Sequence, residues 1–511
     1  MTTKLQQQLR RSKRRLERRL DKTRPSRNDR PVLSASNIHY EIAERVHGIS
    51  HGGIGVFHLL ARRIGLIDAI DRKLHLLKIH LPYHESDHVL NIAYNALCNG
   101  DCLQDIELRR QDVNFLDALG AQRIPDPTTA GDFCRRFTPE TINILQDSYD
   151  EVRIGLWQQQ PAAFFERAIL DADGSLVETG AECKEGIDIA YDGTWGYHPL
   201  IVSLANTREV MRLVNRAGNR PSHEDAADAL DRAAATCFRG GFRQVLMRGD
   251  TDFSQTQHLD RWNRDPRIRF IFGYDAKPNL VDSAEYLPGL TWKKLHRRQP
   301  PEPKTGTRQR TPNVKDDLVR THEFETLRLQ SEEVAEFNYR PHACQEEYRM
   351  VVVRKNISRE KGEQRLFDEI RYFFYITNDW VPDAHEIVLG PHGANGRCHQ
   401  ENLIQQLHGG VRALKAPVDT LVSNWAYMVM TSLAWNLKAW AALSLPETGR
   451  WAEKYQAEKL WLLGIEFKTF INTMVALPCQ IVRQAGRLVY RVLAYHSYQP
   501  IFFRLLDALR C

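Results

Sequence analysis

Between residues 164 and 275, short apolar runs alternate with helical segments in an order that few folds accommodate. The apolar runs are typical of buried strands, and an Ala-rich segment followed by Gly240-Gly241 is typical of a helix with a glycine stop. Ser222 is the expected N-cap of that helix, with Asp225 three residues later. The predicted elements are strands at 168–171, 199–205 and 209–214, a helix from 222 to about 237, a strand at 242–247, a helix at 254–262 and a strand at 268–274.

Acidic residues stand at the ends of two of these predicted strands. Asp171 and Asp173 close the first strand, and because they are two residues apart their side chains point to the same face. Asp250 follows the fourth strand in a glycine-containing turn. This order matches a ribonuclease H-like core, in which one acid lies on the first strand and a second lies just after the fourth.

A third acid, Glu401, lies far downstream at the start of a predicted helix. Arg397 precedes it by one helical turn, where its charge could orient the carboxylate or meet a phosphate. Three carboxylates from distant parts of a chain can hold two divalent metal ions that cleave a phosphodiester. The sequence therefore predicts a metal-dependent phosphoryl-transfer site built from Asp173 or Asp171, Asp250 and Glu401.

The remaining segments surround this core. We expect an α/β fold: a ribonuclease H-like mixed-sheet catalytic core with a β-rich insertion, preceded by a helical N-terminal domain. The predicted insertion contains strands at 324–329, 349–354 and 371–377. The expected boundaries are 1–34 for a basic arm, 35–160 for the helical domain with possible DNA-end binding, 161–275 for the first part of the core, 276–372 for the insertion, 373–445 for the second part with the last acid, and 446–511 for a basic helical C-terminal region that includes Arg483, Arg487 and Arg491.

Positive charge is concentrated in two places. Residues 1–30 hold twelve Lys or Arg against three acids, although the whole chain carries a net charge of only +6. Such an arm favours contact with a polyanion, most often nucleic acid, and a solubilising tail is the alternative. A second basic stretch, at 293–315, reads as an exposed loop. Its candidate DNA-binding residues are Lys293, Lys294, Arg297 and Arg298.

Other features limit the class of protein. Nine cysteines occur without a CxxC pair, which argues against a structural zinc site and indicates reduced thiols in a cytosol. The N-terminus lacks the apolar stretch of a secretion signal. Residues 420–437 are apolar, but Asn424 and Asn436 lie within them, so a buried core helix is expected rather than a membrane span. Trp195 is expected in the core, with a base-stacking role as the alternative.

Over residues 35–495 the chain resembles a DDE transposase of bacterial insertion sequences, of the type with a β-rich insertion before the last acid. The motifs that carry the resemblance are Asp171-Ala172-Asp173-Gly174-Ser175, the turn from Tyr191 to Leu200, Arg248-Gly249-Asp250-Thr251-Asp252-Phe253, and Gly396 to Asn402. In this family the first acid precedes a small residue and then Thr or Ser. The resemblance therefore implies Asp173 as the first acid, with Asp171 as the alternate, and Asp250 rather than Asp252 as the second.

The last motif departs from the family's pattern. Many relatives carry Tyr, two residues, Arg, three residues, Glu, six residues and Lys. Arg397 and Glu401 fit this spacing, but Ala394 stands in place of the Tyr and His408 in place of the Lys. Arg412 or Lys415 is the candidate replacement for the missing Lys.

The resemblance implies that Asp173, Asp250 and Glu401 bind two Mg²⁺ or Mn²⁺ ions and that the protein cleaves DNA strands and transfers them. The implied partners are the element's terminal inverted repeats and target DNA, bound by a homo-oligomer in the bacterial cytoplasm at the nucleoid, without a membrane. A related metal-dependent nuclease without strand transfer is one alternative. A DNA-binding protein that has lost catalysis is another.

Overall fold

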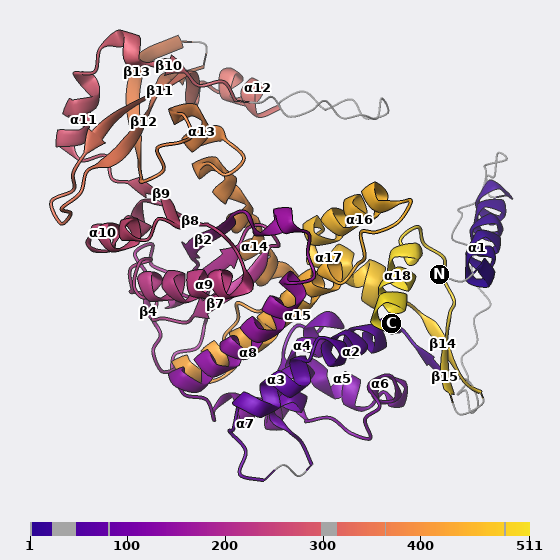
Figure 1. The fold of residues 1–511 in the computed structure, drawn as a ribbon. Coiled ribbons are helices and arrows are strands. Elements are labelled where there is room, and N and C mark those ends of the chain that lie inside the picture. Colours follow the sequence, from indigo (N-terminus) through magenta and orange to yellow (C-terminus); the bar gives the residue numbers. More distant parts are fainter. Residues whose placement is uncertain are drawn as a thin grey trace.

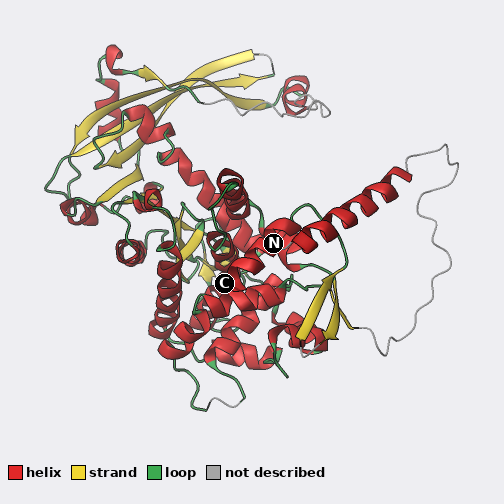
Figure 2. Cartoon of the chain, turned by 45° about the vertical axis from the view of Figure 1, so that its right-hand side comes forward, coloured by secondary structure: helices red, strands yellow, loops and turns green. Residues whose placement is uncertain are grey.

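The computed structural model describes residues 3–22, 47–79, 82–297, 314–362, 364–484 and 487–510. A central mixed sheet is surrounded by helices, and a long β-arm extends from one side of it (Figure 1). A small sheet near the C-terminus lies on the opposite side of the molecule (Figures 1 and 2). In the view of Figure 1, the helices of the N-terminal half pack below the central sheet.

The central sheet has nine strands in the order β10-β11-β12-β13-β9-β8-β2-β6-β7. Strands β2, β8 and β9 run parallel, whereas β6, β7 and the strands of the arm join antiparallel. The core strands are β2 (Ala168–Gly174), β6 (Leu200–Leu204), β7 (Glu209–Val214), β8 (Val245–Gly249) and β9 (Ile268–Tyr274). With helices α9 (Ala226–Gly240) and α10 (Thr256–Arg264), they confirm the element order expected for a ribonuclease H-like core.

Helix α9 begins later than the sequence pattern indicates. Ser222 is not its N-cap; the helix starts after Asp225, which adopts a left-handed conformation with φ of 63°. The preceding residues form turns because Arg216 Nη1 donates hydrogen bonds to the carbonyl oxygens of Pro221, Ser222 and Glu224. The end of the helix agrees with expectation, since Gly241 is left-handed with φ of 106°.

The β-rich insertion is an extension of the central sheet. Its strands are longer than the apolar runs predict: β11 (Glu325–Tyr339), β12 (Tyr348–Lys361) and β13 (Gln364–Thr377), with β10 (Lys293–Lys294) at the edge. The end of β13 pairs with β9, so hydrogen bonding continues from the arm into the core. Helices α11 (Pro278–Glu285), α12 (Val314–Thr321) and α13 (Ala384–Leu389) accompany the arm.

The segment before the core is mainly helical, as predicted. The helices are α1 (Thr3–Lys22), α2 (Ile54–Arg63), α3 (Leu66–Lys73), α4 (Glu85–Leu97), α5 (Ile106–Arg110), α6 (Val113–Leu119), α7 (Pro127–Cys134) and α8 (Pro139–Trp157). Side chains of α2 to α8 contribute to the same hydrophobic cluster as the core strands. These helices therefore share one core with the sheet.

Helix α15 (Leu421–Leu443) is the buried core helix expected at 420–437, and all but its first two residues are buried. Its polar side chains pair with β7, the outermost strand of the sheet. Asn436 accepts the N–H of Val210 at 2.9 Å and donates to its carbonyl at 3.1 Å. Trp425 Nε1 donates to Leu213 O, and Gln146 of α8 accepts the N–H of Leu213. Side chains thus replace the missing neighbour of an edge strand.

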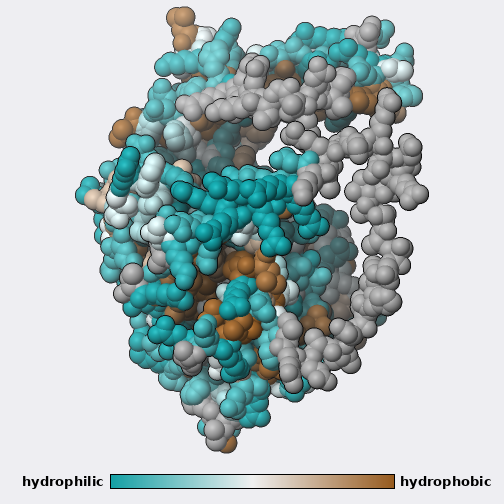
Figure 3. All heavy atoms as spheres, turned by 90° about the vertical axis from the view of Figure 1, so that its right-hand side faces the viewer, coloured by the Kyte–Doolittle hydropathy of each residue, from teal (hydrophilic) through white to brown (hydrophobic). Residues whose placement is uncertain are grey.

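No helix within the described ranges is long and apolar enough to cross a membrane. Hydrophilic residues cover most of the face seen in Figure 3, and apolar atoms gather in smaller patches on it.

The C-terminal region differs from the predicted basic helical tail. Helices α16 (Ala452–Gly464), α17 (Phe467–Phe470) and α18 (Gln499–Arg510) are present, but Arg483, Arg487 and Arg491 lie on a hairpin of β14 (Cys479–Gln484) and β15 (Arg487–Val492). Strand β1 (His47–Ile49) pairs with β14. The prediction of a helix here is wrong: β14 pairs with β15 in a hairpin and also with β1, which lies more than 400 residues away in the sequence.

A second small sheet contains β3 (Val177–Glu178), β4 (Asp188–Ile189) and β5 (Trp195–Tyr197). Trp195 is 36% exposed on it, and its Nε1 donates to Ala181 O at 3.0 Å. The expected core position of Trp195 is therefore wrong. Tyr197, two residues later, is the fully buried aromatic side chain of this strand.

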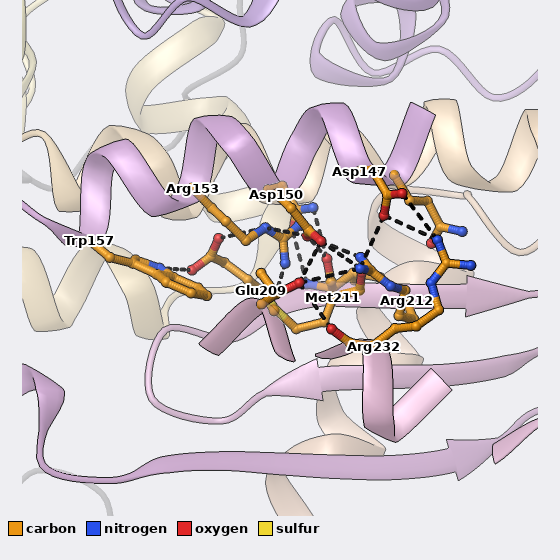
Figure 4. Close-up of polar contacts among 12 residues, drawn as sticks. Asp147, Asp150, Arg153, Trp157, Glu209, Met211, Arg212 and Arg232 are labelled. Atoms are coloured by element: carbon orange, nitrogen blue, oxygen red, sulfur yellow. Dashed lines mark hydrogen bonds and ion pairs between the residues drawn. The ribbon is translucent and has the colours of Figure 1, made fainter. Parts of the chain in front are cut away.

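Buried charges join α8 to β7 (Figure 4). Asp150 is fully buried and accepts hydrogen bonds from Arg212 Nη1 at 3.0 Å and from Thr236 Oγ1 at 2.7 Å. Glu209, also fully buried, accepts the indole N–H groups of Trp157 and Trp440 at 2.9 and 2.8 Å. Burial alone would raise the pKa of Asp150, but Arg212 and Arg153 hold it below its ordinary value. Asp150 is therefore ionised, and its buried negative charge is stabilised by both arginines.

We predict that Asp150→Asn lowers the free energy of unfolding by about 3–5 kcal/mol, because the substitution leaves buried arginine charge without its carboxylate. The matched control is Asp147→Asn. Asp147 pairs with Arg212 and Arg232, but its side chain is 43% exposed, so its loss should cost less than about 1 kcal/mol. Urea unfolding of the two variants measures the difference, and equal losses would contradict the role given to burial.

Candidate active site

The first two predicted acids lie at the same end of neighbouring parallel strands. Strands β2 and β8 pair in a register that sets Asp171 beside Arg248. Asp173 and Asp250 each follow two residues later. Asp250 caps the short turn η3 (Thr251–Phe253), where its side chain accepts the N–H of Asp252 at 3.1 Å. The strand register therefore brings the two acids together.

Arg397 lies between these acids. Its Nη1 is 2.9 Å from Asp173 Oδ2 and 3.7 Å from Asp250 Oδ2. Burial raises the pKa of Asp173 to about 6; Arg397 opposes this effect, and the charges of Asp250 and Glu401 add to it. Burial also raises the pKa of Asp250, again against Arg397. The positive charge of Arg397 therefore lowers the pKa of both carboxyl groups, but not enough to cancel the effect of burial.

Glu401 lies on α14 (Cys398–Gln405) and faces the same cleft as Asp250 and Arg397. This cleft of about 390 Å³ is also lined by Tyr375 of β13. Helix α14 is anchored by the neighbouring residue Gln400, which is buried, accepts the Ser203 hydroxyl and donates to Ile201 O at 3.0 Å. The anchor to β6 orients the helix so that Glu401 remains exposed toward the cleft.

Asp171, the alternate first acid, has a different environment. It is 1% exposed, and both of its carboxylate oxygens are held by Arg248, with Nε–Oδ1 at 2.7 Å and Nη2–Oδ2 at 2.8 Å. Of the two aspartates on β2, Asp173 is the one that contacts Arg397.

Two histidines flank the strand end that carries Asp173. A Cβ atom on Gly174 would lie 2.5 Å from His198 Nε2, so the ring occupies the space that a side chain would need. His408 Nε2 lies 2.8 Å from Ser175 Oγ. Burial lowers the pKa of both histidines. His408, which stands in place of the family's Lys, is therefore joined to the first-acid motif.

The other predicted DNA-binding residues lie apart from the cleft. Arg412 forms an ion pair with Asp101, and Lys415 Nζ donates to Asp101 O at 3.2 Å. Lys293 and Lys294 are exposed on β10, whereas Arg297 pairs with Glu332 of β11. Arg298 lies outside the described residues. Arg397 is thus the one residue of this predicted set that the structure places among the three acids.

The donor set suits a hard divalent cation, since carboxylate oxygens are the ligands that Mg²⁺ and Mn²⁺ prefer. Burial is the main cause of the raised pKa values of Asp173 and Asp250; neighbouring carboxylates add to it, and Arg397 opposes it. Across the described ranges, no three His, Cys, Asp or Glu side chains already form a group close enough to hold a metal ion. In this structure Arg397 Nη1 lies between Asp173 and Asp250.

Comparison with known proteins identifies the family. The family model described as Transposase DDE domain group 1 matches residues 44–511. The chain belongs to this family. Among solved structures, the chain is similar to a piggyBac transposase, from a cryo-EM structure titled as a synaptic complex with hairpin DNA, at 10% identity over 84% of each chain and a TM-score of 0.35. No curated protein matches the sequence.

Sequence reasoning assigned no role to three residues that contact the candidate site of this DDE transposase: Arg248, Gln400 and His198. Arg248 offered a signal, because it precedes Asp250 by the same two residues that separate Asp171 from Asp173. On adjacent parallel strands, equal spacing places such residues side by side. Gln400 and His198 depend on contacts with β6 and Gly174 that no local pattern reveals.

We predict that Gly174→Ala destabilises the protein by about 1–3 kcal/mol, because the added methyl group displaces His198. Gly155→Ala is the matched control. Gly155 lies near the end of α8 with no atom within 4 Å of the added carbon, so this change should stabilise by about 0.5–1 kcal/mol. Thermal and urea unfolding give both values. Equal effects would show that His198 does not constrain the residue after Asp173.

Proposed function

We propose that this DDE transposase cleaves DNA at the ends of an insertion sequence and joins the freed 3′ ends to target DNA. The observation that carries the proposal is the convergence of Asp173, Asp250 and Glu401, from three separate elements, around Arg397. A terminal inverted repeat and a target duplex are the proposed substrates, and a homo-oligomer on DNA is the proposed assembly.

Asp173, Asp250 and Glu401 are the proposed ligands of two Mg²⁺ or Mn²⁺ ions, which would activate the attacking hydroxyl and neutralise charge on the leaving oxygen. The acids act by position and charge, and no covalent bond to the protein is required. Arg397, released from Asp173 and Asp250, is placed to contact a phosphate that enters the cleft.

Basic segments away from the cleft are the proposed source of general DNA affinity. Helix α1 carries nine Lys or Arg and two acids, and most of its residues are exposed. Lys293 and Lys294 on β10 are exposed as well. Such charges bind phosphates with little dependence on sequence. Recognition of the element's ends then rests on other surfaces.

Asp250→Asn tests the chemistry. The substitution preserves shape but removes a metal-binding charge, so we expect strand cleavage and joining to fall by orders of magnitude while folding and DNA binding persist. Asp252→Asn is the matched control, since Asp252 is an exposed acid in the same turn and lies outside the proposed triad.

The assay is cleavage of a labelled duplex that contains the element's end, with and without Mg²⁺, and transfer of the product to a second duplex. Near-parental cleavage by Asp250→Asn would refute the mechanism. Cleavage without transfer would identify a metal-dependent nuclease instead, and binding without either activity in the parent would identify an inactive DNA-binding protein.

Deletion of residues 1–30 tests the basic arm. The arm neutralises many phosphate charges on binding and so releases counterions from the DNA. The truncated protein should therefore bind element ends and unrelated DNA more weakly, to a similar degree, and its affinity should depend less steeply on salt concentration. Fluorescence anisotropy at several salt concentrations measures both effects. A loss confined to element ends would show that the arm reads bases.

A further inference from the structure

A buried ion pair lies directly beneath the proposed metal ligands. Arg248 and Asp171 are 2% and 1% exposed and are joined by two parallel hydrogen bonds of 2.7 and 2.8 Å. Both carboxylate oxygens of Asp171 are used in this pair. Separating two such charges in a protein interior is costly, so the pair is a fixed part of the fold. The proposed function leaves it without a role.

The same guanidinium holds a third element. Arg248 Nη1 donates to Gly393 O at 2.9 Å, in the segment that leads into the turn η5 (Ala394–Arg397). A Cβ atom on Gly396 would fall well inside van der Waals contact with that Nη1. The absence of a side chain at Gly396 therefore lets η5 pack against the arginine. The backbone of Gly396 does not have a positive φ, so space rather than backbone conformation is the reason for glycine at this position.

Arg248 lies on β8 and contacts β2 and the segment of η5, and these three elements carry the proposed ligands or lead directly to them. Asp171 precedes Asp173 by two residues on β2, and Arg248 precedes Asp250 by two residues on the path from β8. Turn η5 contains Arg397 and continues directly into α14, which carries Glu401. A planar guanidinium can donate in three fixed directions at once, which a lysine ammonium on a flexible stem cannot reproduce.

We propose that Arg248, held by Asp171, is a positioning residue that fixes η5 and α14 against β2 and β8, so that Arg397 and Glu401 face Asp173 and Asp250. Asp171 thus acts through Arg248 and binds no metal ion. The inference rests on the proposed function for its consequence in catalysis. The contact that it describes is independent of that function.

The test variant is Arg248→Lys, and the matched control is Arg349→Lys. Arg349 is also a buried arginine that pairs with an acid, Glu336, and donates to a loop carbonyl, Asp379 O, at 3.1 Å, but it lies at β12 away from the acids. Hydrogen exchange of residues 391–405 and the Mg²⁺ concentration for half-maximal cleavage are measured in the full chain.

We expect Arg248→Lys to accelerate exchange in residues 391–405 and to raise the Mg²⁺ midpoint about tenfold or more, with DNA affinity unchanged. Arg349→Lys should change neither. If Arg248→Lys leaves exchange at the parental rate, or if both variants loosen residues 391–405 equally, the positioning role is refuted.

A double-mutant cycle tests the contact without using activity. Gly396→Ala should destabilise the parent, and it should cost clearly less in the Arg248→Lys background, where Nη1 is absent. Additive effects would overturn the proposed packing. If the parent cleaves no DNA with any divalent cation, the proposed function fails, whereas exchange and the cycle still decide whether Arg248 positions η5.

Discussion

The outer strand β7 can end the central sheet only because side chains take the place of a neighbouring strand. Asn436, Trp425 and Gln146 satisfy backbone groups of Val210 and Leu213 that would otherwise be buried without partners. Asp150 of α8 pairs with Arg212 of β7, and Glu209 of β7 accepts the indole N–H of Trp157 of α8 (Figure 4). Because these contacts come from helices before and after the core, the sheet, the N-terminal helices and α15 form one packed unit. The strands that carry the acids lie inside that unit.

Local pattern was sufficient where a residue's neighbours in space are also near in sequence. The five core strands, the glycine stop of α9 and the burial of α15 follow from apolar runs, Gly241 and helical spacing. The pattern failed where a distant segment determines the structure. β14 pairs with the distant β1 as well as with its neighbour β15, and α9 starts late because Arg216 binds the turn before it. Asn436, which interrupts an apolar helix in the sequence, has its explanation only in the edge of β7.

The candidate site divides in the same way. Acids at the ends of two predicted strands, in the element order of a ribonuclease H-like core, indicated that Asp173 and Asp250 would lie together. The family resemblance favoured Asp173 over Asp171, and the structure adds that Arg248 occupies both oxygens of Asp171. The position of Arg397 between two carboxylates, and the anchoring of α14 by Gln400, depend on the packing of a helix against β6. Spacing along the chain carries no information about that packing.

The place of α15 in the chain has a consequence for synthesis. Every proposed metal ligand has been synthesised once Glu401 is made, but the helix that completes the edge of the sheet is made later, at Leu421–Leu443. A product that stops between these points contains the full set of acids and exposes β7 together with the apolar surface that α15 covers. It is a substrate for chaperones and proteases rather than a shortened enzyme. The fold around the candidate site is therefore completed only after α15 has been made.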